Sequence, residues 1–238
     1  MANNVFGDPI NDLALTQLER ARQALDTQTA GGKDNNARTF VRNLKAQYGN
    51  GVSALCIFYN ATGNTLTFVD SKDWYGQIWT SPYPQRIQNG QWGAFLHTKK
   101  PVVATGSMAA AVFRGTDGNG NSCDYMMSWM HPWGAISNSV CIQAREPDSF
   151  KAQWDKIYGL LERNGRQDTD YWNGTWSSMF TGTEKSAMVE ATFSLQAASR
   201  VALNAAPVDP DAAPVDPEAA PVDPDAAPVD SDAARVDS

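Results

Sequence analysis

The sequence predicts a mainly β protein with helices, an α+β fold built on an antiparallel β-sandwich. We expect two N-terminal helices, one helix after the sheet and a disordered C-terminal tail. Three observations predict this fold: helical spacing of apolar residues before residue 50, short β-branched and aromatic runs from residue 52 to residue 145, and an acidic repeat after residue 204. Short, regularly spaced strands separated by Gly-rich turns are typical of sandwiches and barrels.

The first 50 residues contain two helical patterns. Apolar residues recur at helical spacing in residues 10–28 and again in residues 35–48. The two stripes are Ile10, Ala14, Leu18, Ala21 and Leu25, then Ala37, Val41, Leu44 and Tyr48. Gly49-Asn50-Gly51 follows the second stripe and is a typical helix end. We expect residues 1–50 to form a helical segment that packs on the body.

After residue 51 the spacing becomes that of β-strands. "VSALCIFYN" and "TLTFVD" are β-branched and aromatic, and the intervening "ATGN" fits a hairpin turn between them. Further strand-like runs are Gln91–His97, Ala109–Arg114, Cys123–Met130, Val140–Arg145 and, near the end, Ala187–Leu195. We therefore predict a β-sandwich domain over residues 51–200.

One more helix is predicted between the last two of these strands, in "DSFKAQWDKIYGLLERN". Its apolar residues fall on one face at helical spacing. They are Phe150, Trp154, Ile157, Tyr158 and Leu161. Asp148 or Ser149 can cap the start of the helix, and we expect it to lie across an edge or a face of the sheet.

Residues 201–238 form the predicted disordered tail. The seven-residue unit "AAPVDPD" recurs, with small changes, four times across residues 205–232. Proline forbids helix, and one valine per unit is too little apolar surface to offset the entropy of ordering. We expect an extended, acidic, polyproline-like segment. It is either a solubilising extension or a docking segment for a basic partner.

The charge is divided unevenly along the chain. The formal net charge is −7, but nine acids and one base lie from Ala205 onward, which leaves 18 bases and 17 acids in the rest. Nucleic-acid binding requires a clustered basic face, and a nearly neutral body does not predict one. The sequence therefore argues against a nucleic acid as partner.

Several features of the sequence predict a cytoplasmic location. The start "MANNVFGDPI" lacks the basic and apolar runs of a secretory signal, and no stretch approaches the roughly 18 apolar residues of a transmembrane segment. The three cysteines are Cys56, Cys123 and Cys141. An odd and sparse count indicates free thiols in a reducing compartment.

The sequence predicts no catalytic residues, no metal site and no cofactor. Neither His97 at a strand end nor His131 before Pro132 has metal-ligand spacing. "DGNGNS" begins like a calcium loop, but Ser122 and Ser128 stand where that loop requires Gly and Glu, so a hairpin turn is favoured. The only acid or base candidates for an enzyme are Asp73, Asp124, His97 and His131, and no sequence pattern places them together.

Aromatic residues beside prolines are the candidate ligand-binding residues. "IWTSPYP" contains Trp79 and Tyr83, and "SWMHPWG" contains Trp129, Pro132 and Trp133. In one interpretation these rings are buried and stiffen long loops. In the other, the four rings form an exposed cluster at one end of the sandwich, where amphipathic rings suit a lipid headgroup or a glycan.

Several segments resemble the plant 23-kilodalton jasmonate-induced proteins. They are "VFGDPI", "AGGKDNNARTFVRNLKAQYGNGV", "YNATGNTLTFVDSKDWYG", "SPYPQRIQNGQWGAFLH" and "SCDYMMSW". The resemblance implies a jasmonate-responsive and stress-responsive plant protein, associated with defence and salt stress, without established enzymatic activity. It supplies no catalytic residues, and the acidic repeat tail is a departure from the cereal proteins of the family.

A second, weaker resemblance is to actinoporin and aegerolysin-like β-sandwich proteins, in "AAAVFRG", Asp124, "MMSWMHPWG" and Asn138. Those proteins bind membrane lipids through an aromatic loop region, which would place Trp129, Pro132 and Trp133 near the ligand. Two functional hypotheses follow. The first is a non-enzymatic stress protein that binds a lipid headgroup or glycan. The alternative is an abundant interaction or storage-like protein with buried rings and no small-molecule ligand.

Overall fold

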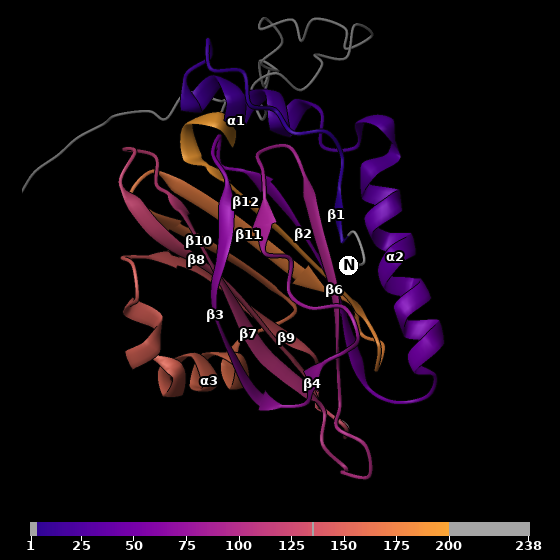
Figure 1. Cartoon of the computed structure of the whole chain (residues 1–238). Helices are drawn as coiled ribbons and strands as arrows, with labels where there is room; N and C mark the ends of the chain where they lie inside the picture. The colour runs from indigo at the N-terminus through magenta and orange to yellow at the C-terminus, as the bar shows by residue number, and fades with distance from the viewer. Residues whose placement is uncertain (1–3, 135, 200–238) are drawn as a thin grey trace, which may run out of the picture. The chain divides into compact units, whose positions relative to one another are not determined.

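The computed structural model describes residues 4–134 and 136–199. Two β-sheets pack face to face, with helices on their outer sides (Figure 1). The seven-stranded sheet contains, in spatial order, β1 (Val5–Phe6), β6 (Trp92–Thr98), β2 (Ser53–Ala61), β12 (Met188–Leu195), β11 (Thr175–Thr181) and β10 (Gln167–Trp172), with β4 (Gln77–Ile78) also beside β6. The five-stranded sheet contains β5 (Arg86–Ile87), β3 (Leu66–Tyr75), β7 (Ser107–Thr116), β8 (Ser122–His131) and β9 (Ser139–Arg145).

This arrangement confirms the predicted α+β fold built on a β-sandwich, with one difference in strand pairing. β2 and β12 run parallel, with Cys56 opposite Val189, whereas the other pairs are antiparallel. All nine residues of β2 are buried. The strand has the core on one face and helix α2 on the other, which is the environment in which parallel pairing and continuous apolar runs occur.

The hairpin predicted for "VSALCIFYN" and "TLTFVD" is wrong, because β2 and β3 belong to different sheets. The connection between them is held by side chains rather than by strand pairing. The Asn60 carboxamide donates to the carbonyls of Asn64 and Ile87 at 2.8 Å each. Gly63 has a φ of 78°, and a Cβ there would overlap the Gln17 carbonyl. Tertiary contacts therefore turn the chain from one sheet to the other.

The three predicted helices are present. α1 (Gln17–Asp26) is shorter than predicted, because Thr16 and Glu19 form a capping box that starts the helix there. α2 (Lys33–Tyr48) lies along the seven-stranded sheet (Figure 1). α3 (Trp154–Arg163), preceded by a 3₁₀ turn at Ser149–Ala152, packs Ile157 and Leu161 on the outer face of the five-stranded sheet.

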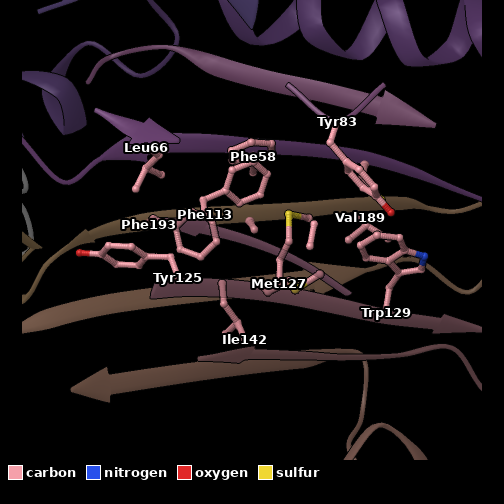
Figure 2. Close-up of a cluster of buried hydrophobic side chains, with 14 of the residues drawn as sticks. Phe58, Leu66, Tyr83, Phe113, Tyr125, Met127, Trp129, Ile142, Val189 and Phe193 are labelled. Carbon is pink, nitrogen blue, oxygen red and sulfur yellow. The ribbon is translucent and has the colours of Figure 1, made fainter. Parts of the chain in front are cut away.

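The core between the two sheets is aromatic. Phe58 from β2, Phe113 from β7 and Phe193 from β12 pack together, with ring centroids 4.6 and 6.1 Å from that of Phe58. Figure 2 shows these rings between the strands of the two sheets. The predicted free thiols are confirmed, since all three cysteines are buried and unpaired. The predicted tail lies outside the described residues.

Candidate functional site

A cavity of about 620 Å³ opens at one end of the sandwich. Its walls come from the β6–β7 loop (residues 99–106), the β8–β9 loop (residues 132–134 and 136–138), the end of β3 and helix α3. The residues that line it include Tyr75, Thr105, Met130, Pro132, Trp133 and Tyr158. The volume is in the range of small-ligand sites, and the walls are mostly apolar.

Two loops meet at the floor of this cavity because Gly106 has no side chain. A Cβ at Gly106 would overlap the carbonyl oxygen of His131 and lie 2.8 Å from the Cα of Pro132. Glycine therefore allows the β6–β7 loop to pass against the start of the β8–β9 loop. The close approach brings Val102 and Trp133, which are far apart in sequence, to the same end of the molecule.

The β6–β7 loop turns at Pro101 and Val102. Val102 has a φ of 56° and a fully exposed side chain (104%). Proline followed by a residue with positive φ is the pattern of a type II turn, whose second central position favours glycine. A β-branched residue at positive φ is strained. This turn therefore holds an exposed valine in a backbone conformation in which glycine would be more stable.

Exposed apolar side chains gather on these two loops. Val103 is 45% exposed, Trp133 46% and Ile136 70%, beside the fully exposed Val102. We call these four residues the apolar loop surface. Scattered exposed apolar residues are ordinary, but a group at the rim of an apolar cavity marks an interaction site. Figure 1 shows the β6–β7 loop projecting beyond the strands at the bottom of the view.

Two lysines lie near the exposed indole of Trp133. The Lys99 ammonium lies 5.2 Å from the ring centroid and the Lys185 ammonium 5.9 Å. Both distances are within the range of cation–π attraction. The Lys99 Nζ also donates to the carbonyls of Lys100 and Val103, at 3.3 Å each. Lys99 thus holds the turn that exposes Val102 and places positive charge beside the cavity.

The predicted exposed cluster of four aromatic rings is wrong. Trp129 is wholly buried and Tyr83 almost so, and Figure 2 shows both among the core side chains. The ring of Trp79 packs edge-on against Tyr48, with centroids 5.0 Å apart. Of the predicted ligand-binding residues, only Pro132 and Trp133 lie at the cavity. Both tryptophans belong to the same short motif. Trp129 points inward from β8 and is buried, whereas Trp133 lies in the loop after β8 and is exposed.

The structure brings together Asp73, His97 and a residue that the sequence did not indicate, Ser107. His97 Nε2 lies 3.2 Å from Asp73 Oδ1, and His97 Nδ1 lies 2.8 Å from Ser107 Oγ. A carboxylate only accepts, so the neutral ring donates from Nε2 to Asp73 and accepts at Nδ1 from Ser107. The Trp129 Nε1–H donates to the same Ser107 Oγ at 3.1 Å.

Ser107, His97 and Asp73 follow the order of nucleophile, base and acid in a serine hydrolase. Their position in the core differs from that of a catalytic triad, whose serine is accessible to substrate. Ser107 and His97 are both completely buried, so a substrate cannot reach the hydroxyl. Burial lowers the pKa of His97, although Asp73 opposes the shift. The four residues come from β3, β6, β7 and β8 and thus link the two sheets. We interpret this network as a structural link.

His131 is a second buried imidazole, close behind the cavity. Its Nδ1–H donates to the Ser53 carbonyl at 3.0 Å, and its Nε2 lies 2.9 Å from Thr181 Oγ1. Burial disfavours the charged ring and lowers the pKa of His131 to about 4. The ring is therefore neutral at pH 7 and joins the two sheets at this end of the sandwich.

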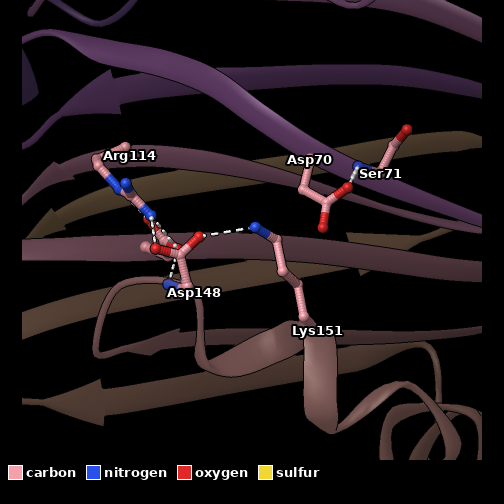
Figure 3. A network of polar contacts seen from close by, with 6 residues as sticks. Asp70, Ser71, Arg114, Asp148 and Lys151 are labelled. Carbon is pink, nitrogen blue, oxygen red and sulfur yellow. Dashed lines mark hydrogen bonds and ion pairs between the residues drawn. The ribbon is translucent and has the colours of Figure 1, made fainter.

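Asp124, the remaining acid candidate, lies in a polar network on the five-stranded sheet. Arg114 donates to both of its carboxylate oxygens, at 2.8 and 3.0 Å, and the Asp148 amide donates to one of them at 2.7 Å. Figure 3 shows Arg114 and Lys151 converging on Asp148. Hydrogen bonds from Lys151 and Arg114 lower the pKa of Asp148. Asp124 thus fixes the chain at the entry to α3.

The calcium-like segment is the predicted hairpin turn. Asp117 Oδ1 accepts the amides of Asn119 and Asn121, at 2.9 and 2.8 Å. Across residues 4–134 and 136–199, His, Cys, Asp and Glu side chains form no group of three that could hold a metal ion. In the same part of the chain, no helix combines the length and the apolar character needed to cross a membrane.

Comparison with known proteins relates this architecture to characterised relatives. The chain matches the Nakanori-like protein family over residues 7–197. It is 42% identical over 177 residues to the 23 kDa jasmonate-induced protein of Hordeum vulgare, which covers 69% of this chain and 84% of that protein. A jasmonate-induced protein homolog of Atriplex canescens is 27% identical over 114 residues, 46% of this chain and 60% of that one.

A solved structure matches the fold. The crystal structure of the lipid binding protein Nakanori superposes with a TM-score of 0.72 and 28% identity. The match covers 79% of this chain and 98% of Nakanori. The similarity therefore includes almost the whole of that protein and most of the body described above.

Proposed function

Since the chain belongs to the Nakanori-like protein family, we propose that it is a stress-responsive protein that binds lipid membranes through its apolar loop surface, without enzymatic activity. The resemblance to the jasmonate-induced proteins is confirmed by the relatives from Hordeum vulgare and Atriplex canescens. The role in defence and salt stress belongs to this proposal, as does a location in the cytoplasm, where the three free thiols stay reduced.

The apolar loop surface is the observation that carries the proposal. Val102, Val103, Trp133 and Ile136 project from two adjacent loops beside an apolar cavity. Complete burial of a valine or isoleucine side chain contributes about 1.5–3 kcal/mol relative to exposure. Tryptophan is favoured at the boundary between headgroups and acyl chains. Shallow insertion of the two loops would bury all four side chains at once.

The strained turn at Val102 supports the same function. A residue held in an unfavourable backbone conformation points to a functional requirement, since folding would favour its replacement. At Val102 the favoured replacement is glycine, which would remove the exposed side chain. Retention of an apolar side chain at the tip of the loop is what membrane insertion requires.

The composition of the surface favours a lipid over a glycan. Three of its four members are aliphatic, and aliphatic side chains offer neither stacking planes nor hydrogen bonds to sugar hydroxyls. The structural relative with a TM-score of 0.72 is described as a lipid binding protein. Binding of a glycan by the same loops is an alternative that the test below distinguishes.

Vesicle flotation with the full-length chain tests the proposal. We expect the protein to float with phospholipid vesicles and Trp133→Ala or Ile136→Ser to reduce binding about tenfold each. Tyr171→Ala is the matched control, because Tyr171 on β10 is 61% exposed and does not line the cavity. Absence of binding to vesicles by the unmodified protein would reject lipid binding. Glycan-array binding without vesicle binding would favour the glycan, and neither would favour the storage-like alternative.

A further inference from the structure

We propose that Lys99 and Lys185, whose ammonium groups both lie near the Trp133 ring, bind the phosphate of a lipid headgroup, so that the protein selects membranes with anionic phospholipids. This inference rests on the proposed function and adds the headgroup class. Its starting point is the pair of ammonium groups that share one exposed indole, at 5.2 and 5.9 Å from the ring centroid.

The two lysines come from distant parts of the chain and are brought together by the start of β2. The Lys99 amide donates to the Val52 carbonyl at 3.0 Å, and the Ser53 amide donates to the Lys185 carbonyl at 3.3 Å. Val52, just before β2, and Ser53, its first residue, thus fix the backbones of both lysines. The start of β2 therefore positions the backbones of both lysines at this end of the sandwich.

Acidic side chains do not neutralise this pair within the described part of the chain. The ion pairs found there involve neither Lys99 nor Lys185. Glu162 lines the cavity on its α3 side, and the Glu184 carboxylate lies against Gly182. Lys100 adds a third exposed positive charge on the same loop. Like charges repel, and an anion between the ammonium groups would relieve that repulsion.

The chemistry of the pair fits a phosphate beneath a lipid headgroup. Lysine binds phosphate as a point charge with three rotatable donors. Its long stem lets the ammonium remain at headgroup level while neighbouring apolar side chains enter the acyl region. Val103, whose carbonyl accepts from Lys99 Nζ, belongs to the inserting surface. The β6–β7 loop thus carries both an apolar side chain for the acyl region, Val103, and a charged side chain for the phosphate layer above it, Lys99.

The test measures binding of the full-length protein to phosphatidylcholine vesicles with and without phosphatidic acid. Each lysine near an anionic surface contributes about fivefold in affinity, so we expect the double variant Lys99→Gln/Lys185→Gln to lose roughly 25-fold on anionic vesicles. Its loss on phosphatidylcholine alone should be much smaller, since the added negative charge is absent there and the variant mainly removes the Lys99 contacts that hold the β6–β7 turn. Lys156→Gln is the matched control, since Lys156 is exposed and does not line the cavity.

Soluble glycerol 3-phosphate distinguishes the sources of the phosphate. Competition that reduces only the anionic part of vesicle binding supports a phosphate site in the membrane context. Binding of glycerol 3-phosphate by a protein that ignores vesicles would overturn the lipid assignment. An equal loss in Lys156→Gln, or no preference for phosphatidic acid, would overturn this inference alone. In that case the proposed function would still be supported if the protein bound phosphatidylcholine vesicles and Trp133→Ala reduced this binding.

Discussion

Trp129 and Trp133 lie four positions apart, yet Trp129 is 0% exposed and Trp133 is 46% exposed. The Nε1–H of Trp129 donates to Ser107 inside the core, whereas the Trp133 ring lies at the surface within cation–π distance of two lysines. Similar residues in one short motif therefore have different roles. The first stabilises the sandwich and the second belongs to the candidate binding surface.

Replacement of these two tryptophans should separate stability from binding. Trp129→Ala leaves a large cavity in the core and should lower the free energy of unfolding by about 3–5 kcal/mol. Trp133→Ala should change it by less than about 1 kcal/mol, because the ring is half exposed. Urea denaturation followed by circular dichroism measures both. A large destabilisation by Trp133→Ala would indicate that its ring mainly supports the fold.

Val102→Gly should weaken membrane binding without a loss of stability. Glycine adopts the φ of 56° found at this position without strain, which stabilises the folded chain. Its greater conformational freedom in the unfolded chain offsets part of this stabilisation. We therefore expect the free energy of unfolding to stay within about 1 kcal/mol and vesicle binding to fall several-fold. Thermal melting and flotation of the same preparation provide the two readings. Unchanged flotation would remove Val102 from the inserting surface.

Stability should fall between pH 6.5 and pH 4 because His131 is buried as a neutral ring. Its pKa is lowered from 6.5 to about 4 in the folded chain, so the unfolded chain binds more protons in this window. The free energy of unfolding then decreases as the pH falls, by about 2 kcal/mol between pH 7 and pH 5. Burial lowers the pKa of His97 as well, which acts in the same direction.

Urea denaturation of the unmodified protein and of His131→Gln at pH 7 and pH 5 checks this origin. The variant should be less stable at pH 7, because it loses contacts to Ser53 and Thr181, but its stability should depend less on pH. Equal pH dependence of the two proteins would show that other groups dominate. Carboxylates with lowered pKa, such as Asp148, lose their contribution only below this window.

Gly106→Ala should disturb the cavity rather than the sheets. A methyl group at this position meets the backbone of His131 and Pro132, which cannot move like the end of a flexible side chain. We expect a loss of about 1–3 kcal/mol in stability and weaker vesicle binding, since the two loops must separate. Hydrogen exchange localised to residues 99–106 and the β8–β9 loop would report the change. Unaltered exchange in both loops would contradict the close packing at the cavity floor.

The helices and most strands could be predicted from sequence because their apolar periodicity is strong. The β10–β11 hairpin was not predicted, although Asn173-Gly174 is a typical hairpin turn. On β10, acids occupy positions that usually hold apolar residues. Asp168 and Asp170 accept hydrogen bonds from the β9 amides of Ile142 and Ala144, at 2.9 and 2.8 Å. Because these acidic side chains bind the edge of β9, β10 lacks the alternation of apolar residues that would have predicted a strand.

The candidate site was predictable only in part. Proline beside an aromatic ring indicated Pro132 and Trp133, but the same signal indicated Tyr83, which the core buries. Val102 and Ile136 gave no signal, because isolated aliphatic residues in loops are common and their exposure depends on how two distant loops meet. The two lysines beside Trp133 meet only through the pairing around β2.

Quenching of tryptophan fluorescence by phosphatidylcholine brominated on its acyl chains tests the central claim most directly. Of the eight tryptophans, Trp133 is the one on the proposed inserting surface. We predict that vesicle-bound protein shows quenching that disappears in Trp133→Phe and persists in Trp176→Phe, a ring on β11 away from the cavity. Bound protein with no quenching, or with the same quenching after Trp133→Phe, would contradict membrane insertion at this end of the sandwich.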